Sequence, residues 1–160
     1  MKRLIFCLAL TFWGPGTSIY AQTDIFERTS FSLGRSVIDE FLPEGFAYDP
    51  IIFLFNTPIY SFGAFTVYGE TQLTQAFNTL RRKMEYEFGW NGGISYQIHL
   101  AQHLLLTAAI GSGPHYISVE TRSQAKGFIF SDNFELGLTY QVPKTDTLIH
   151  LKGRFRHVSN

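Results

Sequence analysis

The residues best suited to chemistry are at 153–160 (GRFRHVSN), where a histidine is followed two positions later by a serine and then by an asparagine. Alternation along a β-strand points residues i and i+2 to the same face, so His157 and Ser159 would share one face. An imidazole beside a hydroxyl can act as a base and activate it as a nucleophile. A pair of this kind usually needs an acid that orients the histidine. The stretch therefore predicts a Ser–His hydrolytic pair whose acid has still to be identified.

The strand that carries this pair, expected at residues 148–160, has two distinct faces. Lys152, Arg154 and Arg156 share the even face, so we expect that face to line a polar interior. His157 and Ser159 fall on the opposite face, together with the apolar residues Ile149, Leu151 and Phe155. A hydrolase with this pair on an outer apolar wall would act on a lipid.

The rest of the chain favours a membrane barrel as the element that positions the pair. Residues 88–101 alternate between a face of Phe, Trp, Ile, Tyr and Leu and a face of small and polar residues, and residues 128–142 restore the pattern. Such alternation over a long strand is typical of a transmembrane β-barrel. Charged residues make up 16% of the 160 residues, below the roughly 25% of soluble domains. No stretch after the N-terminus is apolar for the roughly 18 residues of a membrane helix.

Six or seven strands are expected, whereas the smallest bacterial barrels have eight, so the chain looks one closing strand short. Further candidates are residues 31–37, 51–56, 60–74 and 104–111, and Pro58 is predicted to break the chain. Residues 75–83 are predicted to hold a helical turn or a loop, and residues 112–114 a loop. Residues 143–146 (PKTD) are expected to form the turn before the last strand. The predicted fold is thus an all-β, antiparallel outer-membrane barrel of the eight-stranded type, with its last strand missing.

The N-terminus reads as a secretory signal peptide over residues 1–21, followed by a barrel domain over residues 22–160. Lys2 and Arg3 precede a short apolar stretch, and Ala21 ends a plausible cleavage site. An N-terminal membrane anchor is the alternative, but about 10 apolar residues do not span a bilayer. Removal of Cys7 would leave no cysteine for disulfides or thiolate chemistry. The near-neutral charge gives no reason to expect nucleic-acid binding.

The terminal residues 156–160 (RHVSN) resemble the His-x-Ser-Asn signature of the lipid A 3-O-deacylase family (PagL-type, also labelled acyloxyacyl hydrolase). Residues 88–93, 111–116 and 127–134 are similar to aromatic and glycine-rich strands of this family, and the resemblance covers about residues 50–160. It implies an eight-stranded barrel in the bacterial outer membrane, with lipopolysaccharide (lipid A) as substrate and outer-membrane lipid as surroundings. It implies no metal and no organic cofactor.

The same resemblance implies roles for the last residues. His157 would be the general base, Ser159 the nucleophile on the 3-O ester of an acyl chain, and Asn160 part of an oxyanion hole. The family's acid is a glutamate on the following strand, which would lie beyond Asn160, so a C-terminally truncated chain with weak or no turnover is expected. No acid within the chain clearly replaces it, because Glu135 is predicted to face inward, Asp132 to lie near the end of a loop, and Asp146 to lie in a turn.

Two other readings stay open. One is a small barrel without catalysis, whose polar strand faces serve structure or the passage of small solutes. The other is a secreted, soluble β-sandwich or a lipocalin-like binder of lipids, because strands of such proteins alternate as well. The sequence does not determine the oligomeric state of the protein, and a homodimer is one possible state.

Overall fold

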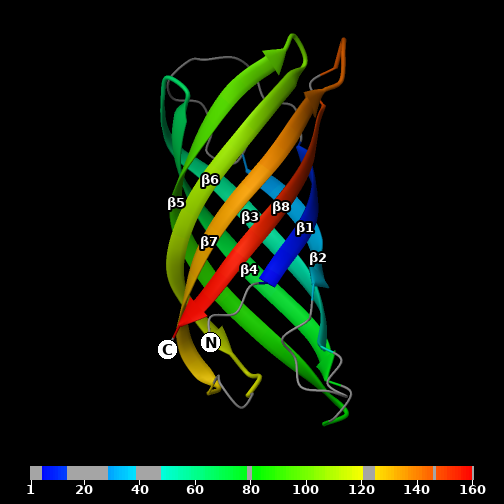
Figure 1. Ribbon diagram of the computed structural model, residues 1–160, viewed down its shortest axis with the longest axis vertical. Helices are drawn as coiled ribbons and strands as arrows, with labels where there is room; N and C mark the ends of the chain where they lie inside the picture. The colour runs from blue at the N-terminus through cyan, green and yellow to red at the C-terminus, as the bar shows by residue number, and fades with distance from the viewer. Residues whose placement is uncertain are drawn as a thin grey trace.

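The computed structural model describes residues 5–13, 29–38, 48–78, 81–120, 125–145 and 147–159, within which all regular elements are β-strands. Each strand pairs antiparallel with the next, and β8 also pairs with β1, so the sheet closes into a barrel (Figure 1). The predicted all-β, antiparallel, barrel-like fold is confirmed. The described ranges contain no helix long and apolar enough to cross a membrane. The strands are β1 (Ile5–Trp13), β2 (Ser30–Ile38), β3 (Tyr48–Phe62), β4 (Phe65–Asn78), β5 (Lys83–Ala101), β6 (Leu104–Ile117), β7 (Gly127–Gln141) and β8 (Leu148–Ser159).

Strand β1 is formed by the segment for which the sequence predicts a signal peptide. Its backbone pairs with β8 over residues 5–13 and with β2 over residues 6–12. The position beside β8, where the sequence predicts a missing strand, is therefore occupied by Ile5–Trp13. One molecule cannot use Ile5–Trp13 both as a cleaved signal peptide and as a barrel strand, because a signal peptide that has been removed cannot pair with β8.

Strand boundaries differ from the predicted ones at four places. The single strand predicted at residues 60–74 is wrong, because the turn at Gly63-Ala64 divides these residues between β3 and β4. Pro58 does not end its strand, because β3 continues to Phe62 and an irregularity in the pairing between Pro58 and Tyr60 accommodates the residue that lacks an N–H. The predicted loop at residues 75–83 is wrong in its first part, since β4 extends to Asn78. The predicted loop at residues 112–114 is also wrong, since β6 runs without a break from Leu104 to Ile117.

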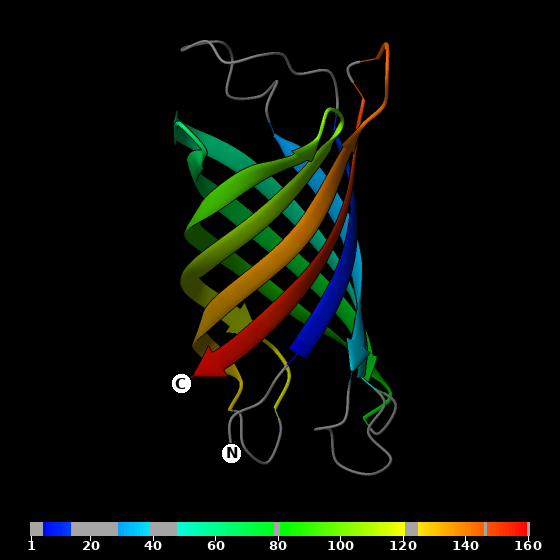
Figure 2. The same cartoon turned by 45° about the horizontal axis from the view of Figure 1, so that its top comes forward.

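The connections between strands are divided over the two ends of the barrel (Figure 2), and the longest of them, residues 14–29 between β1 and β2, lies at the same end as two tight turns. Gly63-Ala64 and Gln102-His103 form tight turns at one end, and Gly63 has the positive φ of 58° that such a turn favours. The connections at the other end span residues 39–47, 79–82 and 118–126. Strand β8 runs towards that second end, so its last residue, Ser159, lies at the end that carries residues 39–47, 79–82 and 118–126.

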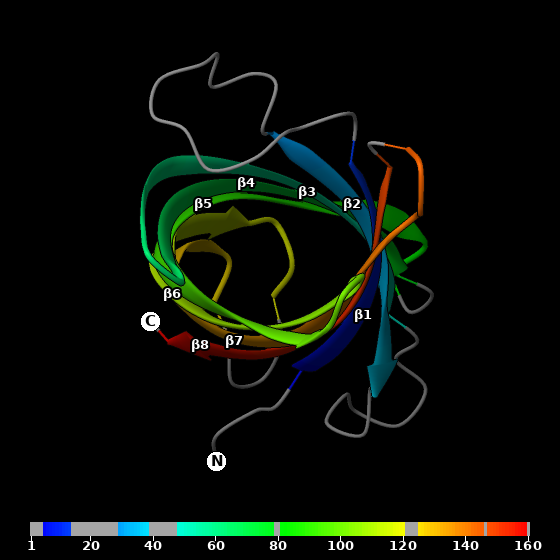
Figure 3. The ribbon, with the colours of Figure 1, turned by 90° about the horizontal axis from the view of Figure 1, so that it is seen from above.

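The closed ring of strands, seen along its axis in Figure 3, is polar inside and apolar outside. Alternation along β5 and β7 follows the predicted faces. The outward side chains include Phe88, Trp90, Tyr96, Phe134, Leu136 and Leu138, which are between 40% and 57% exposed. The buried side chains of the same strands include Glu85, Glu87, Asn91, Ser131, Asn133 and Glu135. This distribution is the reverse of that in water-soluble proteins, whose interiors are mostly apolar.

Candidate active site

Four polar side chains interrupt the outward wall of β5 to β8, and we call them the outward polar group: Ser112, Asp132, His157 and Ser159. Ser112 on β6 lies opposite Asp132 on β7, and Asp132 lies opposite His157 on β8. These three residues therefore form one row across three strands. Ser159 stands in the next row, opposite Phe130. Elsewhere the outward positions of these strands hold apolar or aromatic residues, or glycine.

The two residues predicted to act as base and nucleophile lie on the predicted face. Arg154 and Arg156 are buried in the lumen, with 2% and 6% exposure. His157 is partly exposed and Ser159 is exposed, as expected for the opposite side of the same strand. Asn160, the predicted oxyanion residue, lies outside the described residues. The faces of β8 are thus confirmed, whereas the chemical roles of its residues stay predictions.

Asp132 is placed differently from what the sequence predicts. It lies within β7 rather than near the end of a loop, and its side chain is exposed on the outward wall. Its Oδ1 accepts a hydrogen bond of 2.6 Å from the hydroxyl of Ser112. Glu135 is buried, as predicted, and Asp146 lies outside the described residues. Sequence reasoning therefore passed over an acid on the same face as His157.

The signal that points to Asp132 was already present in the predicted turn. Residues of an antiparallel hairpin pair at equal distances from the centre of their turn. The turn predicted at residues 143–146 has its centre between Lys144 and Thr145, and Asp132 and His157 are equidistant from that point. Folding the two strands about that turn places the two side chains opposite each other.

Apolar residues border the outward polar group on both sides. In the row before it, Phe134 lies opposite both Ile110 and Phe155. In the row after it, Phe130 lies opposite Pro114 as well as Ser159. Further towards the rim, Tyr116 and Phe128 contact each other edge to face, with ring centroids 5.5 Å apart. The polar group is therefore set into a surface that suits hydrocarbon chains.

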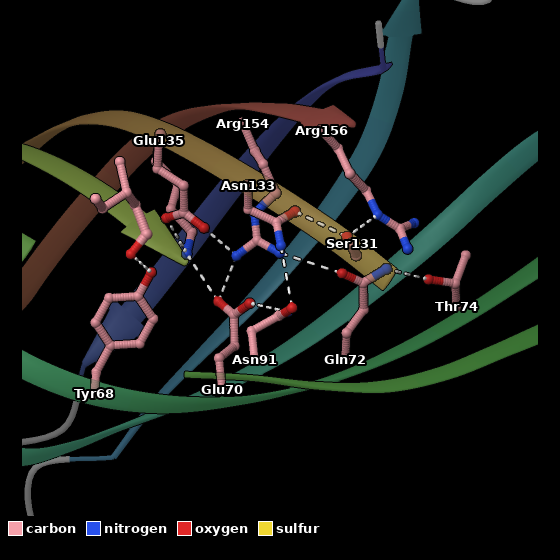
Figure 4. Close-up of polar contacts among 12 residues, drawn as sticks. Tyr68, Glu70, Gln72, Thr74, Asn91, Ser131, Asn133, Glu135, Arg154 and Arg156 are labelled. Carbon is pink, nitrogen blue, oxygen red and sulfur yellow. Dashed lines mark hydrogen bonds and ion pairs between the residues drawn. The ribbon is translucent and has the colours of Figure 1, made fainter. Parts of the chain in front are cut away.

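The lumen behind this surface is occupied by a connected network of charged and amide side chains (Figure 4). Arg154 donates hydrogen bonds to the carboxylates of Glu70 and Glu135, and to the side-chain oxygen of Gln72 at 3.2 Å. Lys152 adds a bond of 3.1 Å to Glu135. One arginine on β8 thus connects to β4 and β7 through the interior of the barrel.

Arg156 makes a second set of contacts closer to the end of β8. Its guanidinium holds the carboxylate of Glu87 with two nitrogens, one of them at 2.9 Å, and its Nε donates to Ser131 at 2.6 Å. The ring of His115 lies against the same carboxylate at 2.6 Å and against Asn91 at 3.0 Å. Because Arg154 and Arg156 alternate with the outward residues of β8, these bonds fix the strand that presents His157 and Ser159.

Glycines on the inner face of β5 make room for the network. A Cβ built on Gly89 would lie 2.1 Å from the ring of His115, whose side chain is buried and bonded on both sides. We expect Gly89→Ala to lower the free energy of unfolding by about 1–3 kcal/mol, because the ring must leave its partners. Urea unfolding of the barrel in detergent measures this change.

Gly92→Ala is the matched control for that substitution. Gly92 lies on the outward face of the same strand, and its added Cβ would approach Trp90 no closer than 3.4 Å. We expect its unfolding midpoint to stay near that of the unaltered chain. Equal midpoints for the two variants would contradict the packing argument.

Within the described residues, no three His, Cys, Asp or Glu side chains gather in a way that could hold a metal ion. Comparison of the chain with protein-family models, curated proteins and solved structures found no match in any of the three.

Proposed function

We propose that the chain is an outer-membrane esterase that removes an ester-linked acyl chain from lipid A. The observation that carries the proposal is the outward polar group, which sets a histidine and a serine into an otherwise apolar outer wall. Polar side chains on a lipid-facing wall cost free energy, so they are retained there for a function more readily than for stability. A hydrolytic pair in that position meets lipids rather than dissolved substrates.

The distribution of side chains supports the membrane part of the proposal. An outward band of apolar and aromatic residues around a polar interior is the pattern of outer-membrane barrels. Strands β3 to β8 have between 12 and 19 residues, and a tilted strand needs about 9–11 to cross a bilayer. Ser159 is the last residue of β8, so the pair lies near one end of the barrel wall, as a site at a membrane surface requires.

In the proposed reaction, His157 takes the proton of the Ser159 hydroxyl. The Ser159 oxygen attacks the carbonyl carbon of the acyl ester at the 3-position of lipid A. The bond between that carbon and the sugar oxygen then breaks, and the sugar hydroxyl leaves with the proton from His157. Water, activated by the same histidine, hydrolyses the acyl-serine and releases a 3-hydroxy fatty acid. The apolar rows beside the pair, centred on Phe130 and Phe134, would hold the acyl chain.

The lumen network supports this proposal over the passage of solutes. Arg154, Glu70 and Glu135 are bonded to one another across the interior and are at most 8% exposed. A lumen filled in this way offers no water-filled path at their level. The non-catalytic alternative would therefore be a structural barrel and not a channel.

The test is to insert the full chain into vesicles that contain lipopolysaccharide and to analyse the lipids by mass spectrometry. We expect the mass of lipid A to fall by that of one 3-hydroxy fatty acid minus one water, and the free acid to accumulate with time. Vesicles carrying a heat-unfolded sample are the control. Intact lipid A after prolonged incubation with the folded barrel would overturn the proposal.

A further inference from the structure

The acid that the Ser–His pair requires has a candidate inside the described part of the chain. Asp132 is exposed on the outward wall, directly opposite His157 in the β7–β8 pairing. Glu70, Glu85, Glu87 and Glu135 are buried in the lumen, on the other side of the sheet from His157. Among the described acids of strands β4 to β8, Asp132 alone is on the face that carries the pair.

The pairing register brings these two residues within reach of a hydrogen bond. Residues directly opposite in an antiparallel sheet have Cβ atoms about 4.5–5.5 Å apart. An aspartate and a histidine on such positions can bring a carboxylate oxygen to a ring nitrogen by rotation about their side-chain bonds. Ser159 is two residues after His157 on the same strand. His157 therefore has Asp132 as its neighbour across the strand pair and Ser159 as its neighbour along β8.

Ser112 gives Asp132 a fixed orientation. Its hydroxyl donates to Oδ1 of Asp132 at 2.6 Å from the side facing away from β8. An ionised carboxylate has two oxygens and about four acceptor positions. The bond from Ser112 therefore orients the carboxylate and leaves it able to accept a ring N–H from His157.

We propose that Asp132 is the positioning acid of this site, a residue that accepts the ring N–H of His157 and thereby presents the other ring nitrogen to Ser159. This inference rests on the proposed function. In the acylation step the proton passes from the Ser159 hydroxyl to His157 and on to the leaving alcohol, and Asp132 takes up no proton. The apolar wall strengthens the attraction between Asp132 and the imidazolium, because charges interact more strongly at low dielectric.

The experiment compares Asp132→Asn, Asp132→Glu and Ser112→Ala in the full chain, inserted in vesicles containing lipopolysaccharide. For Asp132→Asn we expect kcat to fall about 10³-fold or more with little change in KM, because the amide favours the wrong tautomer of the histidine. Asp132→Glu should recover part of the rate, since it retains the carboxylate. Ser112→Ala should lower kcat only several-fold, because it removes the orienting bond and leaves the acid.

A second readout separates positioning from folding. A lipid-tailed fluorophosphonate reacts with an activated serine, so its rate of covalent addition to Ser159 should fall in Asp132→Asn in parallel with kcat. The gel mobility of the unboiled barrel should stay unchanged in all three variants. An active unaltered chain whose rate survives Asp132→Asn would overturn this inference alone, whereas an unaltered chain without activity would overturn the proposed function.

Discussion

Replacing Ser159 with alanine should reduce the release of fatty acid from lipopolysaccharide to background, a loss of at least about 10³-fold in kcat. The hydroxyl is the group that bonds to the acyl carbon in the proposed reaction, and alanine has no atom that can take its place. Ser159 is exposed on β8, so we expect the variant to fold like the unaltered chain. Product release is measured by mass spectrometry at several substrate concentrations.

Two companions make this prediction specific. His157→Ala should cost about as much as Ser159→Ala, and the double variant should be little worse than either, because residues that act as a unit are not additive. Thr71→Ala is the matched control, since it removes a hydroxyl from the β4 position that pairs with Trp90. Activity that persists in Ser159→Ala while the unaltered chain is active would show that another group attacks the ester.

The largest effect on stability is expected for Arg154→Met. The arginine is 2% exposed and bonds to two buried carboxylates, Glu70 and Glu135. Methionine fills much of the same volume but leaves the two carboxylates to share Lys152, which is 3.8 Å from Glu70 and 3.1 Å from Glu135, in place of two cations. Removing one member of a buried ionic cluster costs about 3–5 kcal/mol. The free energy of unfolding in urea, followed by tryptophan fluorescence in detergent, measures the loss.

The cause of that loss can be isolated with two further variants. Adding Glu135→Gln to Arg154→Met should restore part of the stability, because it removes one of the uncompensated charges. Arg81→Met removes the same charge from an exposed position between β4 and β5 and should leave the unfolding midpoint nearly unchanged. A loss of stability as large in Arg81→Met would attribute the effect to net charge and not to the lumen network.

Alternation was sufficient to predict β5, β7 and β8 and to assign their faces, because the period of two is set by the backbone itself. It failed at Pro58 and at residues 112–114, where Pro and Gly indicate a break by their local preferences. In the folded chain an irregular pairing accommodates Pro58 in β3, and Gly113 packs so close to β5 that a Cβ would lie 1.9 Å from the carbonyl oxygen of Trp90. Contacts with neighbouring strands thus override the local preference for a turn.

The sequence predicted some residues of the candidate site and missed others. His157 and Ser159 could be placed on one face because they lie on one strand. Asp132 required the register of a hairpin, which the predicted turn contained. The contact of Arg154 with Glu70 joins residues 84 positions apart, and no pattern along the sequence links them. The sequence therefore indicated which residues face the lumen, but not which of them bond to each other.

The pairing of β1 with both β2 and β8 bears on the order of events during export. A leader peptidase that cuts after Ala21 would separate the strand Ile5–Trp13 from the rest of the chain. The backbone of β8 over residues 148–156, which pairs with that strand, would then need another partner for its hydrogen bonds. Cleavage would then leave the edge of β8 without its partner strand and could not be reversed. The site on β8 would work only after another strand has paired with that edge.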